Sequence, residues 1–349
     1  AEDIPVWAPM QALARWDSGW YGEIAQNGYW LNPGQQSPVV FFPGYPMSVR
    51  LLTWVGMNRW VAGEVLSLAC ALAAIFLLKR WGSLAIATPR QQIDQATRDG
   101  VVHQACWLLA LYPFATYLYG VVYSEAFFLV AAISAFLALE RRQHIWAAVF
   151  GAIATASRPI APALVVGLLV RSLELRRQSG NPLRIIDFVP ALAGIGLAGY
   201  MLFLQVQFDD ALAFAHLQAA PGWDQPPGWQ SWLKVAWFKE LFPHSSLEVK
   251  LRFFTHAIAT FVALGLTIPT FKRLGYGYGF YCLIAVGIPA ISSKDFHSLG
   301  RYIMAAFPLF LTAAMLLESR PKFARWVTAV FAVGLGCLAF ALGANYYVA

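Results

Sequence analysis

Long apolar runs follow one another along most of the chain and are separated by short polar or basic segments. A helix needs about 17 to 25 apolar residues to cross a bilayer. Runs that reach this length cover 60–78, 101–119, 122–139, 188–206, 253–271, 276–292 and 326–344. A further run, 302–317, is slightly shorter. This pattern predicts an all-α, polytopic membrane protein.

The apolar stretch 145–171 differs from the others because Ser157, Arg158 and Pro159 interrupt it. With Arg158 at the apex, the arms 145–157 and 159–171 have thirteen residues each and are about 20 Å long as helices, which is too short to cross the hydrocarbon. We therefore expect this segment to enter the membrane and return, with Arg158 held in the outer part. Together with the other runs, it predicts one domain, 1–349, with about ten membrane passes or half-passes.

The basic residues predict the orientation of these runs. Fifteen of the 25 Lys and Arg residues, but six of the 18 acidic residues, lie in the loops 79–100, 140–144, 171–187, 272–275 and 318–325. Loops rich in Lys and Arg face the cytoplasm. The other side of the membrane then receives two excursions, 1–59 and 207–252, and the segments around Ser124 and Asp295. We expect both excursions to be external, interfacial loops.

Tryptophan is concentrated in the second of these excursions. It contains Trp223, Trp229, Trp232 and Trp237 together with four prolines. Tryptophan at this density near a bilayer boundary is typical of an interfacial belt, and the segment 232–242 predicts a helix in the headgroup plane. Anchorage to the membrane explains each of these side chains more simply than ligand stacking does.

Composition supports the membrane assignment and removes several classes of function. Hydrophobic residues make up 59% of the chain and charged residues 12%, with a mean hydropathy of +0.55, whereas soluble domains have about 25% charged residues. The net charge of +7 follows mostly from the basic loops, and no stripe of Lys and Arg interleaved with aromatics predicts nucleic-acid binding. HExxH, Walker and GxSxG motifs do not occur in the sequence. GIGLAG at 194–199 lies within an apolar run, where small residues allow close helix packing, so it predicts no dinucleotide site.

The first excursion raises a question about Asp17, which lies in RWDSGWYGEIAQNGYW at 15–30. At about 100° per residue, a continuous helix here has an apolar stripe made of Leu13, Trp16, Trp20 and Ile24. Asp17 then lies about 40° from Leu13, at the edge of this stripe, whereas Ser18 lies on the opposite, polar face. Because a carboxylate loses hydration at such a position, we expect Asp17 to have a function.

Other charged residues map to the same side of the membrane as Asp17. The set consists of Asp17, Glu125, Arg158, Asp295 and Arg301. Charges at the membrane edge are functional candidates by default, and His297, two residues after Asp295, is a candidate to join a polar site. The histidines show no ligand spacing. A divalent metal on Asp17 or Asp295 stays an open alternative, but the sequence gives no reason to favour it.

Five motifs, taken in order, resemble the PIG-V family of mannosyltransferases. They are RWDSGWYGEIAQNGYW with FFPGYP after it, YPFATYLYGVVYSEAFF at 112–128, SRPIAP at 157–162 and GRYIMAAFPLF at 300–310. Together they extend over most of the chain and are more specific than any single motif. Members of this family are membrane enzymes of the GT-C glycosyltransferase type, and the eukaryotic ones add the second mannose to glycosylphosphatidylinositol precursors. The resemblance therefore implies a GT-C type helical bundle.

The resemblance also implies an inverting transfer of a hexose, mannose in the family, from a polyprenyl-phosphate-linked donor on the extracytoplasmic side. Asp17 would act as the base at the acceptor hydroxyl, since partial dehydration at the interface makes a carboxylate more basic. Arg301 would bind the donor phosphate and offset the charge of the leaving group, with Arg158 as a second phosphate-binding residue. The residues implied to line the cavity are Trp16, Ser18, Tyr21, Tyr123, Glu125, His297 and Tyr302. No cofactor is implied.

Departures from the family favour a bacterial member in the cytoplasmic membrane. The family has a membrane helix before its WDS motif, which we expect to precede this sequence, and SRP replaces the Arg-Ser-Asn-Gly of eukaryotic relatives. The acceptor is then a glycolipid or another extracytoplasmic glycan. The alternative is a transporter or flippase of a lipid-linked substrate. A protein of that class would have a pair of broken helices, whereas the sequence shows a single break, at Arg158. A non-catalytic lipid-binding scaffold would explain the tryptophans and leave Asp17 unexplained.

Overall fold

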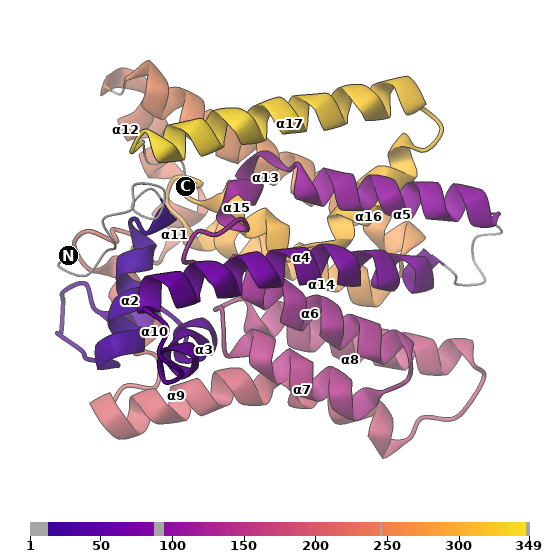
Figure 1. Ribbon diagram of the computed structural model, residues 1–349, viewed down its shortest axis with the longest axis horizontal. Helices are drawn as coiled ribbons and strands as arrows, with labels where there is room; N and C mark the ends of the chain where they lie inside the picture. The colour runs from indigo at the N-terminus through magenta and orange to yellow at the C-terminus, as the bar shows by residue number, and fades with distance from the viewer. Residues whose placement is uncertain (1–12, 87–93, 245, 347–349) are drawn as a thin grey trace.

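The computed structural model describes residues 13–86, 94–244 and 246–346, and all regular secondary structure within these ranges is helical (Figure 1). The α-helices and the 3-10 helices, labelled η, are α2 (Asp17–Asn27), η1 (Pro38–Val40), α3 (Gly44–Thr53), α4 (Arg59–Ile86), α5 (Gln95–Ala110), η2 (Pro113–Tyr117), α6 (Glu125–Glu140), α7 (His144–Thr155), α8 (Ala161–Gln178), η3 (Ile185–Gly194), α9 (Ile195–Phe208), α10 (Ala213–His216), η4 (Leu217–Ala219), α11 (Trp229–Trp232), α12 (Val235–His244), α13 (Leu247–Arg273), α14 (Tyr276–Ser292), α15 (Leu299–Tyr302), η5 (Ile303–Ala305), α16 (Pro308–Leu317) and α17 (Pro321–Gly343). The predicted all-α class is confirmed for this part of the chain.

Four helical segments of the described chain are long and apolar enough to cross a membrane. They are α4, the segment Ile185–Phe208 formed by η3 and α9, Val249–Arg273 within α13, and α17. A fifth candidate is the bent pair Leu299–Ala305 and Pro308–Leu317, whose halves meet at 88°. Two apolar helices are shorter: α7 has 12 residues, too few for a complete span, and α14 has 17, at the lower limit of the spanning length. The protein is therefore a helical membrane protein with four or five candidate spans.

The spanning helices expose apolar side chains. On α4 the exposed residues Val65, Leu68, Leu72 and Phe76 recur every three or four positions and share one face. In the apolar 18-residue stretch of α17, 6% of the residues are buried within the protein. Long exposed apolar stripes are unfavourable in water and match the hydrocarbon of a bilayer, so these faces are suited to contact with lipid.

The predicted run 101–119 is not a single helix. Helix α5 ends at Ala110, and η2 begins at Pro113, which has no N–H to continue the hydrogen-bond pattern of an α-helix. Gly120 follows with a φ of 87°, a conformation that glycine adopts at little cost. The next helix, α6, begins at Glu125. The expectation of one span was wrong because apolar content alone does not separate this loop from a membrane helix.

The long helices lie side by side in an elongated bundle with two distinct ends (Figure 1). The short helices α2, α3, α10, α11 and α12 gather at one end, on the left in Figure 1, which we call the site end. The α6–α7, α8–η3 and α16–α17 turns lie at the opposite end. We call it the basic end because its turns carry Arg141, Arg142, Arg184 and Arg320. These three basic turns therefore lie at the opposite end of the bundle from the short helices of the two excursions.

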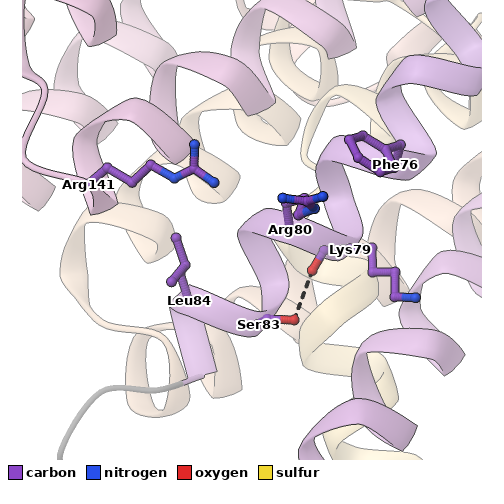
Figure 2. Close-up of a pocket in the computed structure, with 6 residues that line it drawn as sticks. All are labelled: Phe76, Lys79, Arg80, Ser83, Leu84 and Arg141. Carbon is purple, nitrogen blue, oxygen red and sulfur yellow. Dashed lines mark hydrogen bonds between the residues drawn. The ribbon is translucent and has the colours of Figure 1, made fainter.

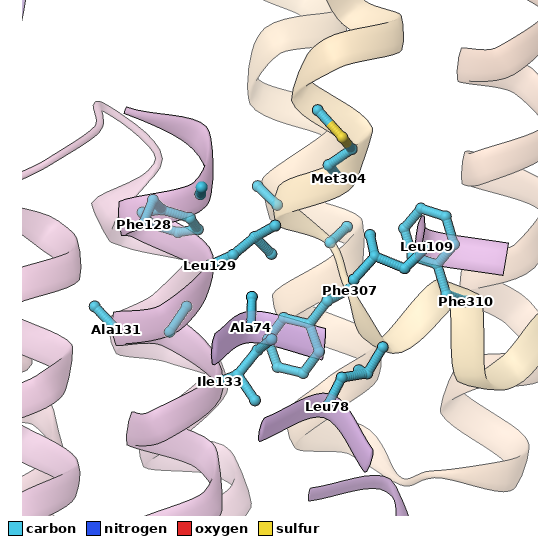
Figure 3. Packing of buried hydrophobic residues seen from close by; sticks show 14 of the residues in the cluster. Ala74, Leu78, Leu109, Phe128, Leu129, Ala131, Ile133, Met304, Phe307 and Phe310 are labelled. Carbon is cyan, nitrogen blue, oxygen red and sulfur yellow. The ribbon is translucent and has the colours of Figure 1, made fainter. Parts of the chain in front are cut away.

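The hydrophobic core lies between α4, α6 and α16 (Figure 3). Phe128 and Leu129 of α6 face this core together with Leu78 of α4 and Phe307, which precedes α16 (Figure 3). Trp81 of α4 packs edge-on against Phe307, with ring centroids 4.8 Å apart. Because lipid tails are as apolar as these side chains, close packing holds membrane helices together. This packing fixes the axes of α4 and α6 relative to each other.

The predicted interruption of 145–171 is confirmed. Helices α7 and α8 are separated by the turn 156–160, which contains Arg158. Gly44, at the start of α3, packs against this turn, and its N–H donates to the carbonyl oxygen of Ala156 at 2.8 Å. A Cβ at position 44 would collide with the neighbouring side chain of the turn. The FFPGYP and SRPIAP motifs therefore meet in the fold, and glycine is required at their contact.

Gly196, in the GIGLAG segment, allows α9 to lie close to α7. A Cβ at this position would collide with the carbonyl oxygen of Ala152 and lie 2.5 Å from Thr155 Oγ1, whereas the Cβ position of Gly199 in the same helix is open. We expect Gly196→Ala to lower the thermal unfolding midpoint in detergent, since overpacking costs about 1–3 kcal/mol. Gly199→Ala, the matched control, should leave the midpoint nearly unchanged. Equal midpoints for the two variants would contradict the proposed close contact.

The tryptophan-rich excursion is partly packed into the protein. Trp229 and Trp232 are 59% and 60% exposed, as expected for an interfacial belt. Trp237 is instead buried, and Trp223 packs against Trp20 with ring centroids 5.7 Å apart. The predicted interfacial belt therefore agrees with the exposure of Trp229 and Trp232 but not with the packing of Trp223 and Trp237.

The helix predicted at 232–242 is interrupted near its start. Lys234 separates α11 from α12 and has a φ of 55°, which a right-handed helix does not accommodate. Its ammonium group is buried and donates to the carbonyl oxygen of Ser293. This tertiary contact attaches the excursion to the end of α14, and no local pattern in the sequence predicts it.

Candidate functional site

Two acids and two arginines from four separate segments meet at the site end of the bundle. Arg301 Nη1 lies 2.9 Å from Asp17 Oδ2, and Arg301 Nε lies 3.2 Å from Glu125 Oε1. Arg158 Nη1 lies 2.8 Å from the same Glu125 oxygen. Glu125, Arg158 and Arg301 are buried, whereas the Asp17 side chain is 19% exposed. We call these four residues the charge cluster.

Helix ends and turns position the members of the charge cluster. Asp17 and Glu125 are the first residues of α2 and α6, where the helix macrodipole favours a negative charge. Arg158 lies in the turn between α7 and α8, and Arg301 lies in the short helix α15. Ser298, directly before α15, has a φ of 61°, a left-handed conformation that is uncommon for a residue other than glycine.

The helix that carries Asp17 differs from the one predicted. It begins at Asp17, because Trp16 has a φ of 50° that a right-handed helix cannot include. Its buried residues are Ser18, Tyr21, Gly22, Ile24 and Ala25. Ser18 was predicted to lie on the polar face, but it is fully buried and its hydroxyl donates to the carbonyl oxygen of Leu13 at 3.3 Å. The predicted stripe was wrong because it assumed a continuous helix through Trp16.

Tyrosine rings surround the two arginines. The Arg301 guanidinium lies 5.3, 5.0 and 5.0 Å from the ring centroids of Tyr117, Tyr123 and Tyr302. The Arg158 guanidinium lies 5.0 Å from the centroid of Tyr302, and Tyr302 Oη accepts a hydrogen bond from Arg301 Nη2 at 3.2 Å. Cations over aromatic faces are stabilised by the ring quadrupole. The rings therefore support both guanidinium groups; Tyr117 was not among the predicted site residues.

Other predicted cavity residues hold the backbone around Asp17. Tyr123 Oη accepts the backbone N–H of Asp17 at 3.2 Å, and Tyr21 Oη shares a hydrogen bond with Ser124 Oγ at 2.9 Å. Burial raises the pKa of Tyr21, so its phenol stays protonated at neutral pH. Trp16 packs against the hydrophobic core. These contacts connect α2 to the segment before α6 and keep the Asp17 carboxylate near the arginines.

The charge cluster is neutral as a whole because two carboxylates face two guanidinium groups. Buried charges are tolerated when they are paired in this way. Glu125 Oε2 is buried and accepts no hydrogen bond from the described residues. In the part of the chain that the structure describes, no three His, Cys, Asp or Glu side chains form a group that could hold a metal ion. The cluster offers a partly exposed carboxylate, Asp17, beside two cations, an arrangement suited to an alcohol and an anion.

His297 lies in the segment before α15, within electrostatic reach of Arg301. Burial lowers the pKa of His297 from 6.5 to about 4; Asp295 opposes this shift and Arg301 adds to it. The imidazole is therefore uncharged at neutral pH. His297 was predicted to join the site, and in this state it adds no third cation to the charge cluster.

Because the pKa of His297 is low in the folded protein, we expect the protein to lose stability as the pH falls. Between pH 6.5 and about 4 the unfolded chain binds a proton that the folded protein excludes, so the free energy of unfolding falls as the pH falls. We expect His297→Gln to flatten this part of the profile of thermal unfolding midpoint against pH. His216→Gln is the matched control, because His216 is 63% exposed and paired with Asp210. Parallel profiles for wild type and His297→Gln would contradict the prediction.

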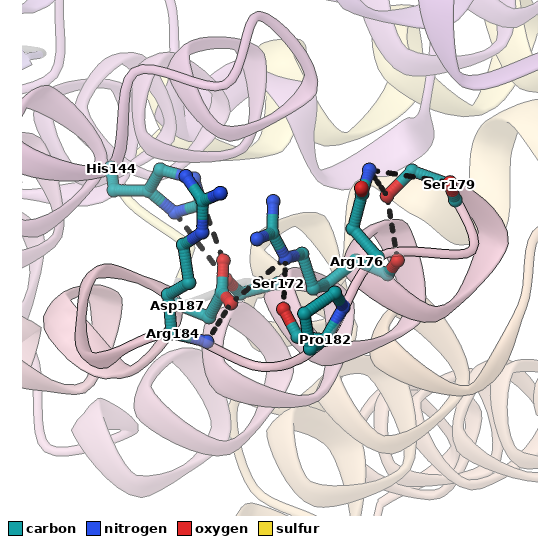
Figure 4. Close-up of polar contacts among 8 residues, drawn as sticks. His144, Ser172, Arg176, Ser179, Pro182, Arg184 and Asp187 are labelled. Atoms are coloured by element: carbon teal, nitrogen blue, oxygen red, sulfur yellow. Dashed lines mark hydrogen bonds and ion pairs between the residues drawn. The ribbon is translucent and has the colours of Figure 1, made fainter.

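A second ionic cluster lies at the basic end (Figure 4). Asp187 is buried, and its Oδ2 accepts the backbone N–H of Arg184 at 2.8 Å. Arg176 Nε lies 3.3 Å from Asp187 Oδ2, and His144 Nε2 lies 4.0 Å from Oδ1 (Figure 4). These contacts join the start of α7 and of η3 to the end of α8, so we assign this cluster a structural role.

Comparison with protein-family models finds no match for this chain, and comparison with curated proteins finds none either. We therefore interpret the charge cluster from its geometry and from the motifs to which its residues belong.

Proposed function

We propose that the protein is an inverting glycosyltransferase of the GT-C type that takes a hexose, mannose by the resemblance, from a polyprenyl-phosphate carrier. The observation that carries the proposal is the meeting of Asp17, Glu125, Arg158 and Arg301 in one charge cluster. These residues belong to four of the quoted motifs, and the first and last are 284 positions apart in the sequence. If the motifs resembled the family by chance, their charged residues would not be expected to lie together in the fold.

In the proposed reaction the acceptor hydroxyl oxygen attacks the anomeric carbon of the donor sugar. The bond between that carbon and the phosphate oxygen breaks, and polyprenyl phosphate leaves with the electron pair. Asp17 accepts the hydroxyl proton, and attack opposite the leaving group inverts the anomeric configuration. A general base contributes about 10²- to 10⁴-fold to such a step, and a guanidinium at the phosphate stabilises the charge that develops on it.

Arg301 couples the two parts of this mechanism. Its Nη1 lies 2.9 Å from Asp17 Oδ2, so a donor phosphate that binds Arg301 competes with the Asp17 carboxylate for the same N–H groups. Once displaced, Asp17 is available to accept a proton. Glu125 stays paired with Arg158 at 2.8 Å and keeps a negative charge close to Arg301. Donor binding therefore prepares the base for the acceptor.

The proposed site faces the extracytoplasmic side of a bacterial cytoplasmic membrane. The basic turns lie at the end of the bundle opposite the charge cluster (Figure 1), and basic loops favour the cytoplasm. A lipid-linked donor reaches the cluster from the membrane, and the exposed part of Asp17 is open to an acceptor. A glycolipid or another extracytoplasmic glycan is the proposed acceptor.

The direct test is transfer of labelled mannose from synthetic polyprenyl-phosphate mannose by the purified protein in detergent, with extracted membrane lipids as acceptors. A labelled glycolipid, or slow release of mannose by hydrolysis, supports the proposal if Asp17→Asn abolishes it. Donor binding without transfer, combined with movement of the donor across a vesicle bilayer, would instead identify a transporter or flippase. Absence of donor binding would overturn the proposal.

A further inference from the structure

A separate cavity lies at the basic end, beside α4 and the α6–α7 turn. It has a volume of about 450 Å³ and is lined by Phe76, Lys79, Arg80, Ser83, Leu84 and Arg141 (Figure 2). We call it the basic pocket. None of its residues belongs to the charge cluster, and none lies in the motifs that led to the proposed function.

Arg80 of α4 and Arg141 of the α6–α7 turn both line the basic pocket. Figure 2 shows the Arg141 side chain extending toward Arg80. The Arg80 guanidinium lies 4.8 Å from the ring centroid of Phe76, which helps to hold it in place. Glu140, next to Arg141 in the sequence, is turned inward, and its Oε1 lies 2.7 Å from Arg171 Nε. The ion pairs of the described residues therefore leave both arginines of the pocket without a carboxylate.

The position along α4 places the basic pocket at the depth of lipid headgroups. Arg80 lies about six turns after Arg59, a rise of about 32 Å, which is close to the hydrocarbon thickness of about 30 Å. Phe76 and Leu84 are 56% and 37% exposed, and they lie one turn before and one turn after Arg80. A molecule with an anionic headgroup and acyl chains complements both the arginines and these apolar side chains.

We propose that the basic pocket binds the phosphate headgroup of an anionic membrane lipid. Arg80 and Arg141 hold the phosphate oxygens, and Phe76 and Leu84 contact the acyl chains. Each guanidinium presents a fork of N–H donors that matches phosphate geometry, and an anion between the two cations removes their mutual repulsion. Basic pockets between membrane helices on the cytoplasmic side are suited to lipid headgroups. This proposal is independent of glycosyl transfer.

The test compares lipid binding by the wild type, by Arg80→Gln/Arg141→Gln and by Arg320→Gln/Arg325→Gln. The last variant is the matched control, because it removes two exposed arginines near the same end but outside the pocket. Native mass spectrometry measures retention of phosphatidylglycerol, with phosphatidylcholine as the neutral lipid and inorganic phosphate as the free anion. We expect the pocket variant to bind phosphatidylglycerol at least about tenfold more weakly, and the control to bind it like the wild type.

Equal weakening in both double variants would show general attraction of anionic lipids to this end and would overturn the site. Phosphatidylcholine bound as tightly as phosphatidylglycerol, or inorganic phosphate bound as tightly as the lipid, would overturn the assignment of the ligand. The thermal unfolding midpoint of each variant checks its folding. If the double variant does not fold, Arg141→Gln alone tests the same contact from an exposed turn.

Discussion

Asp17→Asn is expected to lose transfer activity by about 10²- to 10⁴-fold while it binds polyprenyl phosphate at least as tightly as the wild type. The amide has nearly the shape of the carboxylate but cannot accept the acceptor proton at neutral pH. The substitution also removes the negative charge 2.9 Å from Arg301 Nη1, which leaves the guanidinium more available to phosphate. The combination of lost activity with retained or tighter donor binding follows from the contact between Asp17 and Arg301.

The measurement pairs transfer of labelled mannose with direct titration of polyprenyl phosphate into the purified Asp17→Asn protein. Asp210→Asn is the matched control, because Asp210 also belongs to an excursion at the site end and pairs with His216 at 2.9 Å, outside the charge cluster. Full transfer by Asp17→Asn would remove Asp17 from the mechanism. Weaker phosphate binding would show that Asp17 supports the donor and does not compete with it.

Arg301→Gln is expected to weaken binding of polyprenyl phosphate by about 10- to 100-fold, since hydrogen bonds to charged groups contribute about 1.5–3 kcal/mol. The same change removes the guanidinium that contacts Asp17 and leaves Glu125 paired with Arg158 alone. Removing one partner from a buried ion pair costs about 3–5 kcal/mol. We therefore expect the thermal unfolding midpoint of this variant to fall as well.

Arg301→Lys separates the effect on stability from the effect on donor binding. Lysine keeps a positive charge near Asp17 and Glu125 but lacks the planar fork of donors that fits phosphate. Its thermal unfolding midpoint should lie between those of the wild type and Arg301→Gln, whereas its affinity for polyprenyl phosphate, measured by titration, should stay reduced. Unchanged phosphate affinity in both variants would identify Arg301 as a structural partner of the two acids and remove it from the donor site.

The helical membrane fold could be predicted because it depends on properties summed over many residues. Run length and the distribution of Lys and Arg indicate the helices and the separation of the two ends. The turn 156–160 could also be predicted, since polar residues and proline interrupt an apolar run there. The loop 111–124 could not be separated from its neighbours by hydropathy, because apolar residues fill it. Tyr117, which lies under Arg301, was missed for this reason, although Pro113 was a signal of the break.

The sequence could indicate which charged residues share one end of the bundle, but it could not predict their contacts. Helical periodicity placed Asp17 beside an apolar stripe, whereas the positive φ of Trp16 starts the helix at Asp17 itself. The pairing of Arg301 with Asp17 and Glu125 depends on how α2, α6 and α15 pack together. No local sequence pattern specifies distances between residues so far apart in the chain.

The neutrality of the charge cluster also restricts how this protein can evolve. Loss of one charged residue leaves a buried charge without its partner, whereas loss of an acid together with its arginine does not. Glu125 and Arg158, whose charged atoms are 2.8 Å apart, should therefore be lost together at a lower cost in stability than either alone. Selection would remove the single-substitution intermediates, so the two positions should vary in concert among descendants of this sequence.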